Sequence, residues 1–262
     1  MKKLLLSLVL LTVSMMCFAQ SIEELQKKAQ RGDVNSQAML GEKYYFGEGV
    51  AMNYSKAFYW FLQAAKQGDI NSMDNVAWAY FQGEGTAQDY GEAMRWWRIL
   101  ADNGKVLAMG QIAHLYYMGY GVRQDYAEAA QWHRKAADKG SLRDINRLGY
   151  MYEQGQGVPQ DYQKAFELFT EAAEKGSALS KGYLGEMYYN GWYVAKDYNK
   201  AFTLLKEAAE AKNNPSARAM RLLAACYRYG LGTPQDPTKE KYWLEKAAEK
   251  KDEKAMAIMG EE

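Results

Sequence analysis

Cysteine and histidine are scarce in this chain of 262 residues, and their scarcity restricts the chemistry that it can perform. Of the two cysteines, Cys17 lies close to the N-terminus, within a segment that we expect to be removed. Cys226 then has no partner for an intramolecular disulfide, and its place on an apolar helix face predicts a buried core thiol. The two histidines, His114 and His133, are too far apart in the sequence for the i, i+4 spacing of a helical zinc site. We therefore expect no bound metal.

Catalytic signatures are missing as well. The sequence contains no G-x-S-x-G elbow, no S-x-x-K pair and no G-x-x-x-x-G-K-[ST] phosphate loop. His133 stands at a position that holds an apolar residue elsewhere in the chain, which favours packing over catalysis. The equivalent residues are Phe61, Trp97, Phe169 and Leu205. We expect a protein that is not an enzyme and has no cofactor.

An excess of either charge is absent too. The chain has 33 lysines and arginines against 32 aspartates and glutamates, a formal net charge of +1, and no block of like charges. This balance excludes the basic footprint of a nucleic-acid-binding protein and gives no sign of an electrostatically held partner. We interpret the charged residues as the solvated faces of helices.

Only one long apolar run is present, Leu4–Val13. It follows Lys2 and Lys3, is shorter than the roughly 20 residues of a membrane-spanning helix, and ends before Ala19. This order is typical of a secretory signal peptide. We predict cleavage near Ala19, which changes the formal net charge from +1 to −1, and a secreted or periplasmic protein without a membrane span. A lipid anchor on Cys17 is the rival interpretation, although the residues before it do not resemble a lipobox.

Glycine, by contrast, is plentiful and recurs at a fixed interval. The stretch GYGVRQDYAEAAQWHRKAADKG covers residues 119–140. The chain reads GEGTAQDYGEAMRWWRILADNG 36 residues earlier and GQGVPQDYQKAFELFTEAAEKG 36 residues later. Self-similarity at a constant period of this length is the signature of a solenoid of stacked repeats.

Each repeat has the pattern of a helical hairpin. A first glycine ends one helix, a second glycine makes the connection tight, and an aspartate or asparagine then caps the next helix. The first glycines are Gly47, Gly83, Gly119, Gly155 and Gly191, and the caps are Asn53, Asp89, Asp125, Asp161 and Asp197. Apolar residues three and four apart give each helix one buried stripe. The sequence therefore predicts an all-α fold, a right-handed α-solenoid of stacked helical hairpins.

These repeats divide the chain into four parts. They are a signal peptide (1–19), an N-terminal capping helix (20–32), six repeats (33–251) and a C-terminal half-repeat helix (252–262). The fifth repeat departs from the pattern, because Tyr193 replaces its second glycine and three extra residues precede the sixth repeat. Lys212 stands in place of the closing glycine and is followed by Asn213 and Asn214, which tolerate the left-handed conformation, and Pro215 is expected in the first turn of the next helix.

The residues that recur at equivalent positions of the repeats resemble those of a known family. The pattern L-G-x-x-Y-x-x-G-x-G-V-x-x-D-Y-x-x-A-x-x-W-x-x-x-A-A-x-x-G resembles the Sel-one-like repeat (SLR), a relative of the tetratricopeptide repeat, and it covers essentially the whole chain after the signal peptide. The resemblance implies a non-enzymatic scaffold that binds a protein or peptide. Some cysteine-rich relatives are associated with β-lactams, so the alternative is an envelope enzyme or a cell-wall ligand-binding module, for β-lactam or peptidoglycan. This chain lacks the disulfides of that branch. We expect a monomer.

One face of the first helices carries aromatic residues opposite the core stripe. Because first helices line the inner side of tetratricopeptide-like superhelices, we predict that this exposed face forms a concave binding wall, with Trp78 as its anchor. The predicted partner-binding residues are Tyr45, Asp74, Trp78, Phe81, His114, Tyr117, Tyr150, Glu186 and Tyr189, and Asn146 and Glu153 share the face. In an alternative interpretation, the column that contains Tyr45, Phe81, Tyr117 and Tyr189 packs against the neighbouring hairpin.

Overall fold

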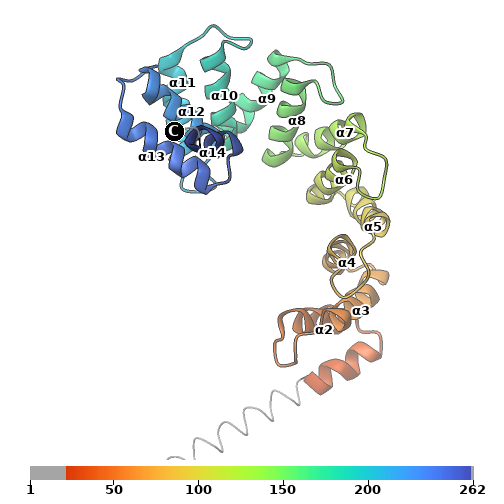
Figure 1. Ribbon diagram of the computed structural model, residues 1–262. Helices are drawn as coiled ribbons and strands as arrows, with labels where there is room; N and C mark the ends of the chain where they lie inside the picture. Colours follow the sequence, from red (N-terminus) through yellow and green to blue (C-terminus); the bar gives the residue numbers. More distant parts are fainter. Residues whose placement is uncertain (1–21, 261–262) are drawn as a thin grey trace, which may run out of the picture. The chain divides into compact units, whose positions relative to one another are not determined.

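The computed structural model describes residues 22–260, and these residues form helices and turns without a β-strand. The chain divides into two compact units, Met1–Gln124 and Asp125–Glu262. In the first unit, residues 22–30 are helical. They are followed by α2 (Val34–Phe46), α3 (Tyr54–Lys66), α4 (Ile70–Gln82), α5 (Tyr90–Asp102) and α6 (Val106–Met118) (Figure 1). The predicted signal peptide lies outside the described residues.

The second unit continues the same alternation of first and second helices. It contains α7 (Tyr126–Ala137), α8 (Leu142–Gln154), α9 (Tyr162–Glu174), α10 (Ala178–Asn190), α11 (Tyr198–Ala209), α12 (Ala217–Tyr229), α13 (Pro237–Glu249) and α14 (Glu253–Gly260) (Figure 1). From α2 to α6 in the first unit and from α7 to α14 in the second, each helix packs against the next one along the chain. The predicted all-α fold of stacked hairpins is confirmed.

Side-chain caps start the helices where the sequence predicts them. Asp89 Oδ1 accepts a hydrogen bond of 3.0 Å from the backbone N–H of Glu92, and the equivalent acceptors cap the other second helices. The first helices α2, α4, α8 and α10 are capped in the same way by aspartate or serine. Lys105 occupies the equivalent position before α6 and makes no side-chain cap. Each cap contributes about 1 kcal/mol to stability.

The two loop glycines have different roles. Gly83 ends α4 in the left-handed conformation, with φ of 77°, and its N–H donates to the carbonyl of Ala79 at 2.8 Å. Gly85, with φ of 74°, lies directly against the backbone carbonyl of Tyr54, so a Cβ there would overlap with the preceding repeat. Gly121 and Gly157 make the same close approach to the start of the preceding second helix. The second glycine is therefore a contact between repeats as well as a turn residue.

Replacing Gly85 with alanine should cost about 1–2 kcal/mol more than replacing Gly104 with alanine. Both positions have a left-handed φ (74° and 79°), so both variants incur the same backbone cost of about 1–2 kcal/mol. Only at Gly85 does the new Cβ meet neighbouring backbone, because Gly104 has open space around its Cβ position. Urea unfolding measures the difference, and equal losses would show that the repeats do not need this close approach.

The core consists of one apolar position that recurs in every first helix and of the second-helix residues that face it. Leu40, Val76 and Ile112 are fully buried, and the column continues in the second unit with Leu148, Leu184 and Leu223. In the sequence a glycine or alanine follows each of these apolar residues, because the second helix of the hairpin comes close to the first one there. The ring of Phe61, for example, occupies the space that a Cβ on Gly41 would need. Cys226 is completely buried, as predicted, and burial raises the pKa of its thiol to about 12.

The insertion before the sixth repeat is accommodated by local backbone geometry. Asn214, within the insertion, adopts a positive φ of 53°, and Tyr193, in the preceding loop between α10 and α11, adopts one of 65°. Ser216 caps α12 and accepts a hydrogen bond of 3.2 Å from the N–H of Ala219. The prediction that Pro215 lies in the first turn of this helix is wrong, because the cap follows the proline and the helix begins at Ala217. Ser216 is the only residue between Pro215 and the first turn, and it is the cap. Pro215 therefore lies outside the helix.

Candidate functional site

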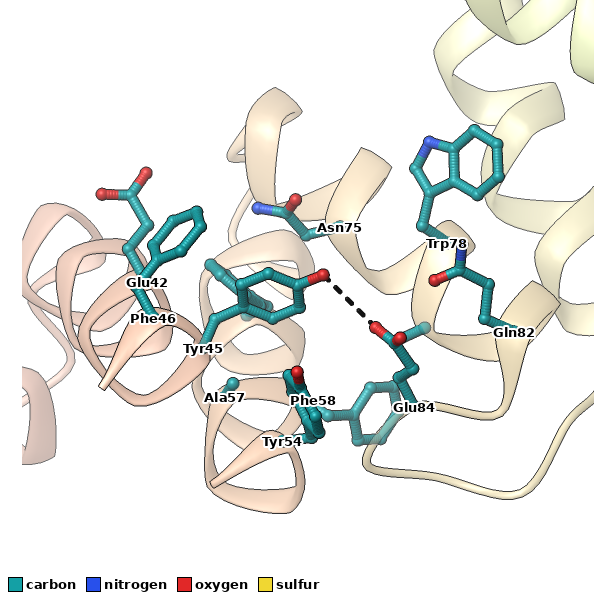
Figure 2. Close-up of a pocket in the computed structure, with 12 residues that line it drawn as sticks. Glu42, Tyr45, Phe46, Tyr54, Ala57, Phe58, Asn75, Trp78, Gln82 and Glu84 are labelled. Atoms are coloured by element: carbon teal, nitrogen blue, oxygen red, sulfur yellow. Dashed lines mark hydrogen bonds between the residues drawn. The ribbon is translucent and has the colours of Figure 1, made fainter. Parts of the chain in front are cut away.

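A groove with aromatic residues at half of its lining positions lies between α2, α3 and α4 in the first unit. It encloses about 440 Å³. We call it the aromatic groove, and it is lined by Glu42, Tyr45, Phe46, Tyr54, Ala57, Phe58, Phe61, Asn75, Trp78, Ala79, Gln82 and Glu84 (Figure 2). The two predicted residues that it contains, Tyr45 and Trp78, come from neighbouring first helices.

Tyr45 and Phe46 form the open wall of the aromatic groove. The Tyr45 hydroxyl donates to Glu84 Oε2 at 3.3 Å, across the space between α2 and the loop after α4 (Figure 2). Its ring lies 5.1 Å from that of Phe46 and 5.2 Å from that of Tyr54. Burial, together with the charge of Glu84, raises the pKa of Tyr45, so its hydroxyl remains a donor. Phe46 is 66% exposed, and together with the exposed Tyr45 it leaves an apolar patch open to solvent at the groove.

Trp78 occupies the opposite wall and is half-buried. Its ring meets that of the fully buried Trp97 edge-to-face at 5.3 Å and that of Phe81 at 5.6 Å. Trp97 Nε1 donates to Asp74 Oδ1 at 3.3 Å, and burial raises the pKa of this carboxyl. Trp78 therefore lines the groove while it also supports the core. Asp74 is a partner of Trp97 and does not line the groove.

Phe81 belongs to a second aromatic cluster within the first unit. Its ring lies 5.3 Å from that of Tyr90, 6.4 Å from that of His114 and 6.3 Å from that of Tyr120. Because His114 and Tyr120 belong to the following repeat, Phe81 packs between repeats, as the alternative interpretation of its column expects. Tyr117 is half-buried, and its carbonyl accepts a hydrogen bond of 2.9 Å from the Gln124 side chain.

In the second unit, the prediction of an exposed face is wrong for the acidic positions. Glu186 is 8% exposed and Glu153 is 1% exposed. Arg218 on α12 reaches both, with an ion pair to Glu186 and a contact of 3.2 Å to Glu153 Oε1. Asn146 is buried as well, and its side chain donates to the carbonyl of Leu142 at 2.7 Å. Arg218, which lies one repeat after Glu186 and two repeats after Glu153, is the cation that accompanies these two buried carboxylates.

The aromatic members of that face are half-buried in the second unit. The Tyr150 ring lies 6.2 Å from that of Tyr183, and the Tyr189 ring lies 5.6 Å from that of Tyr198. Burial is the main cause of a raised pKa at both Tyr183 and Tyr189. No interaction described for these residues joins them to the aromatic groove, so each unit presents its own part of the predicted wall.

The buried ionisable groups of the second unit are held by specific partners. Burial raises the pKa of Glu153, and the nearby Glu186 adds to this effect, whereas Arg218 opposes it. Burial would also raise the pKa of Asp144, but hydrogen bonds from His133 and Ser141 lower it overall. His133 Nδ1 lies 2.7 Å from Asp144 Oδ1. The predicted packing role of His133 is confirmed by its burial, and the residue is also the polar partner of Asp144.

Sequence reasoning missed Phe46, Tyr54, Phe58 and Glu84 as groove residues. Part of this set could have been found from two positions that recur in the repeats. They are the tyrosine after each second-helix cap and the residue between the two loop glycines. These columns meet across repeats, since the rings of Tyr90 and Tyr120 stack at 4.9 Å and those of Tyr162 and Trp192 at 5.5 Å. Tyr54 and Glu84 are the equivalent pair in the aromatic groove.

Neither a metal centre nor a membrane span is found in the part of the chain that the structure describes. Among residues 22–260, no three or more His, Cys, Asp and Glu side chains gather in a group that could hold an ion. No helix in the same range has both the length and the apolar character that crossing a bilayer requires.

Solved structures of bacterial repeat proteins resemble this chain. A protective antigen of uropathogenic Escherichia coli with an SLR fold is 30% identical over 91% of this chain, with a TM-score of 0.77. This chain covers 50% of that antigen, so it spans half of its length. A Sel1 repeat protein from Oxalobacter formigenes is 29% identical, with 90% of this chain and 95% of that chain covered and a TM-score of 0.71. No curated protein matches the sequence.

The family comparison covers nearly all of the described residues. The Sel1 repeat matches residues 34–69, 70–105, 106–141, 145–177, 182–213 and 217–252. Those segments follow the helical hairpins of the structure, and the resemblance noted in the sequence is thereby confirmed. The chain belongs to the Sel1 repeat family.

Proposed function

We propose that this protein is a non-enzymatic interaction scaffold that binds a peptide or protein partner in the aromatic groove. Sel1 repeat proteins are in general scaffolds for protein interactions and typically lack enzymatic activity. The observation that supports this site most directly is Phe46, which is 66% exposed beside Tyr45 and Tyr54. Aromatic side chains that fill no core position contribute strongly to binding when a partner covers them.

The polar rim of the groove suits an extended segment. Glu42, Asn75 and Gln82 line the space between the aromatic walls (Figure 2). Amide and carboxylate groups at such positions can pair with the backbone N–H and C=O groups of a bound peptide, while apolar partner side chains contact the rings. Of the residues first predicted to grip the partner, Trp78 lines this groove as a half-buried residue, whereas His114 and Tyr150 do not line it.

The proposed location of the protein is outside the cytoplasm, in the periplasm or the cell exterior. This part of the proposal rests on the order of charged, apolar and small residues in 1–19. The N-terminal mass of the exported protein tests it, since cleavage near Ala19 leaves no Cys17 and therefore no lipid.

Replacing Phe46 with alanine should weaken partner binding by about 2 kcal/mol and change stability by less than about 0.5 kcal/mol. The partner is first identified by affinity capture from the envelope, and its affinity is then measured for each variant. Tyr59→Ala is the matched control, because Tyr59 is 52% exposed on α3 and does not line the groove. Equal affinities of the Phe46 variant and the unaltered protein would refute the proposed site. Trp78→Ala is less informative, since its contact with Trp97 makes a loss of stability inevitable.

A further inference from the structure

A second groove lies in the second unit, along the beginnings of α8, α10 and α12. It consists of two adjoining pockets of about 610 and 580 Å³ that share Leu179, Tyr183 and Asn214. We call their union the basic groove. It is lined by Leu142, Arg143, Asn146, Arg147, Gly176, Ser177, Ala178, Leu179, Tyr183, Asn213, Asn214, Pro215, Ser216, Ala217, Arg218, Glu249, Lys250 and Lys251.

Cations greatly outnumber carboxylates in this lining. The cations are Arg143, Arg147, Arg218, Lys250 and Lys251, and the only acidic residue is Glu249. Lys246 already pairs with this carboxylate at 2.8 Å. The chain as a whole is nearly neutral, so the excess of positive charge is a local property of the groove.

Three of the cations have no carboxylate to neutralise them. Arg218 is engaged by Glu153 and Glu186, and Arg143 lies 3.8 Å from Asp144. Arg147, Lys250 and Lys251, in contrast, are exposed and form no ion pair with any described residue. Their side chains reach the groove from α8 at one end and from the end of α13 at the other.

An aromatic and apolar floor lies between the cations. The Tyr183 ring stacks on the Phe169 ring with a centroid distance of 4.4 Å. The Arg218 guanidinium lies 4.8 Å from the centroid of the Tyr183 ring. Because Arg218 is itself held by Glu153 and Glu186, this floor is fixed before any ligand arrives. Leu179 is 36% exposed beside it. The groove therefore combines an apolar centre with unpaired positive charge at both ends.

We propose that the basic groove binds an acidic segment of a protein partner. Glutamate or aspartate side chains of the segment pair with Arg147, Lys250 and Lys251, and an apolar side chain between them packs on Tyr183 and Leu179. The side-chain amides of Asn213 and Asn214 are available to the backbone of the segment. The identification of the occupant as a protein rests on the proposed function, whereas its acidic character rests on the charges alone.

The test uses the full mature chain and a fluorescent glutamate-rich peptide with a central leucine, followed by fluorescence anisotropy. A peptide with glutamine in place of every glutamate should bind about tenfold more weakly at low salt, since each exposed ion pair contributes about 0.2–1 kcal/mol. Salt should remove this preference because exposed charges are screened. Arg147→Glu combined with Lys250→Glu should abolish the preference for the acidic peptide.

A double variant with the same change of charge is the control. Lys206 and Lys241 are exposed cations of the second unit that do not line the basic groove. Lys206→Glu combined with Lys241→Glu should retain binding within about twofold. An equal loss in both double variants would mean that only the net charge matters, and equal binding of the acidic and glutamine peptides would mean that charge does not matter. Either result overturns the proposal.

Two further measurements separate this proposal from its alternatives. Tighter binding of heparin or of phosphatidylglycerol vesicles than of the acidic peptide would assign the groove to a polyanion or a membrane and overturn the peptide occupant. Phe46→Ala should leave acidic-peptide binding unchanged, because the aromatic groove belongs to the other unit. If acidic-peptide binding is absent while Phe46→Ala still weakens partner binding, the proposed function stands and only the basic groove is refuted.

Discussion

Replacing Arg218 with alanine is expected to lower the free energy of unfolding by about 3–5 kcal/mol. Arg218 is the cation that contacts both Glu153 and Glu186, whose side chains are almost fully buried. Without it, two adjacent carboxyl groups face each other in a site with little water. One Oε2 atom, that of Glu153, already accepts no hydrogen bond among the described residues. Urea unfolding at neutral pH measures the loss.

Charge neutralisation provides the control for this variant. Changing Glu153 and Glu186 to glutamine in the Arg218→Ala background removes the carboxylates and keeps the side-chain volumes. Most of the lost stability should return, because an unpaired buried charge costs more than a buried amide. If the triple variant is no more stable than Arg218→Ala, the loss comes from the packing of Arg218 against Tyr183, which the guanidinium also contacts.

The Arg218→Ala variant should gain stability when the pH is lowered from about 7 to about 5. The folded-state pKa of Glu153 is raised by burial even when Arg218 is present. A carboxyl group with a raised pKa binds more protons in the folded state than in the unfolded state. Its contribution therefore favours folding at low pH and is lost as the pH rises through the folded-state pKa. A variant whose stability is constant over this interval would show that the two carboxyl groups are hydrated.

Replacing His133 with phenylalanine should destabilise the second unit by about 3 kcal/mol. Phenylalanine fits the position, which holds Phe61 in the first repeat and Phe169 in the fourth. The loss arises because Asp144, which is fully buried, loses the partner that lies 2.7 Å from its Oδ1 atom. The pKa of Asp144 is lowered in the folded state, so its stabilising contribution is present above the unfolded-state pKa and is lost as the pH falls through the folded-state value.

A second substitution should reverse this loss. The position of Asp144 holds a buried serine in the second and fifth repeats, Ser72 and Ser180. His133→Phe combined with Asp144→Ser therefore recreates the combination that Phe61 and Ser72 represent. The double variant should unfold within about 1 kcal/mol of the unaltered protein. A double variant that is as unstable as the single one would show that this repeat requires the ionic pair for a reason other than satisfying Asp144.

Local spacing was sufficient to predict the elements of the fold. A cap such as Asp89 and a left-handed glycine such as Gly83 act on backbone groups within a few residues, so their effects can be read from a short stretch of chain. The same holds for the buried column of Leu40, Val76 and Ile112, because an apolar stripe repeats with the helical period. The period of 36 residues then determined that the hairpins stack.

Tertiary structure alone decided which polar residues are buried and where charge gathers. Helical periodicity placed Glu186 on an outward face, and only the arrival of Arg218 from the next first helix makes its burial tolerable. Likewise, Arg147 and Lys250 lie far apart in a sequence without blocks of like charge, yet they line one groove. Ion pairs and grooves join residues from different repeats, and their free energy depends on distance and solvent exposure. Those quantities exist only once the helices have packed.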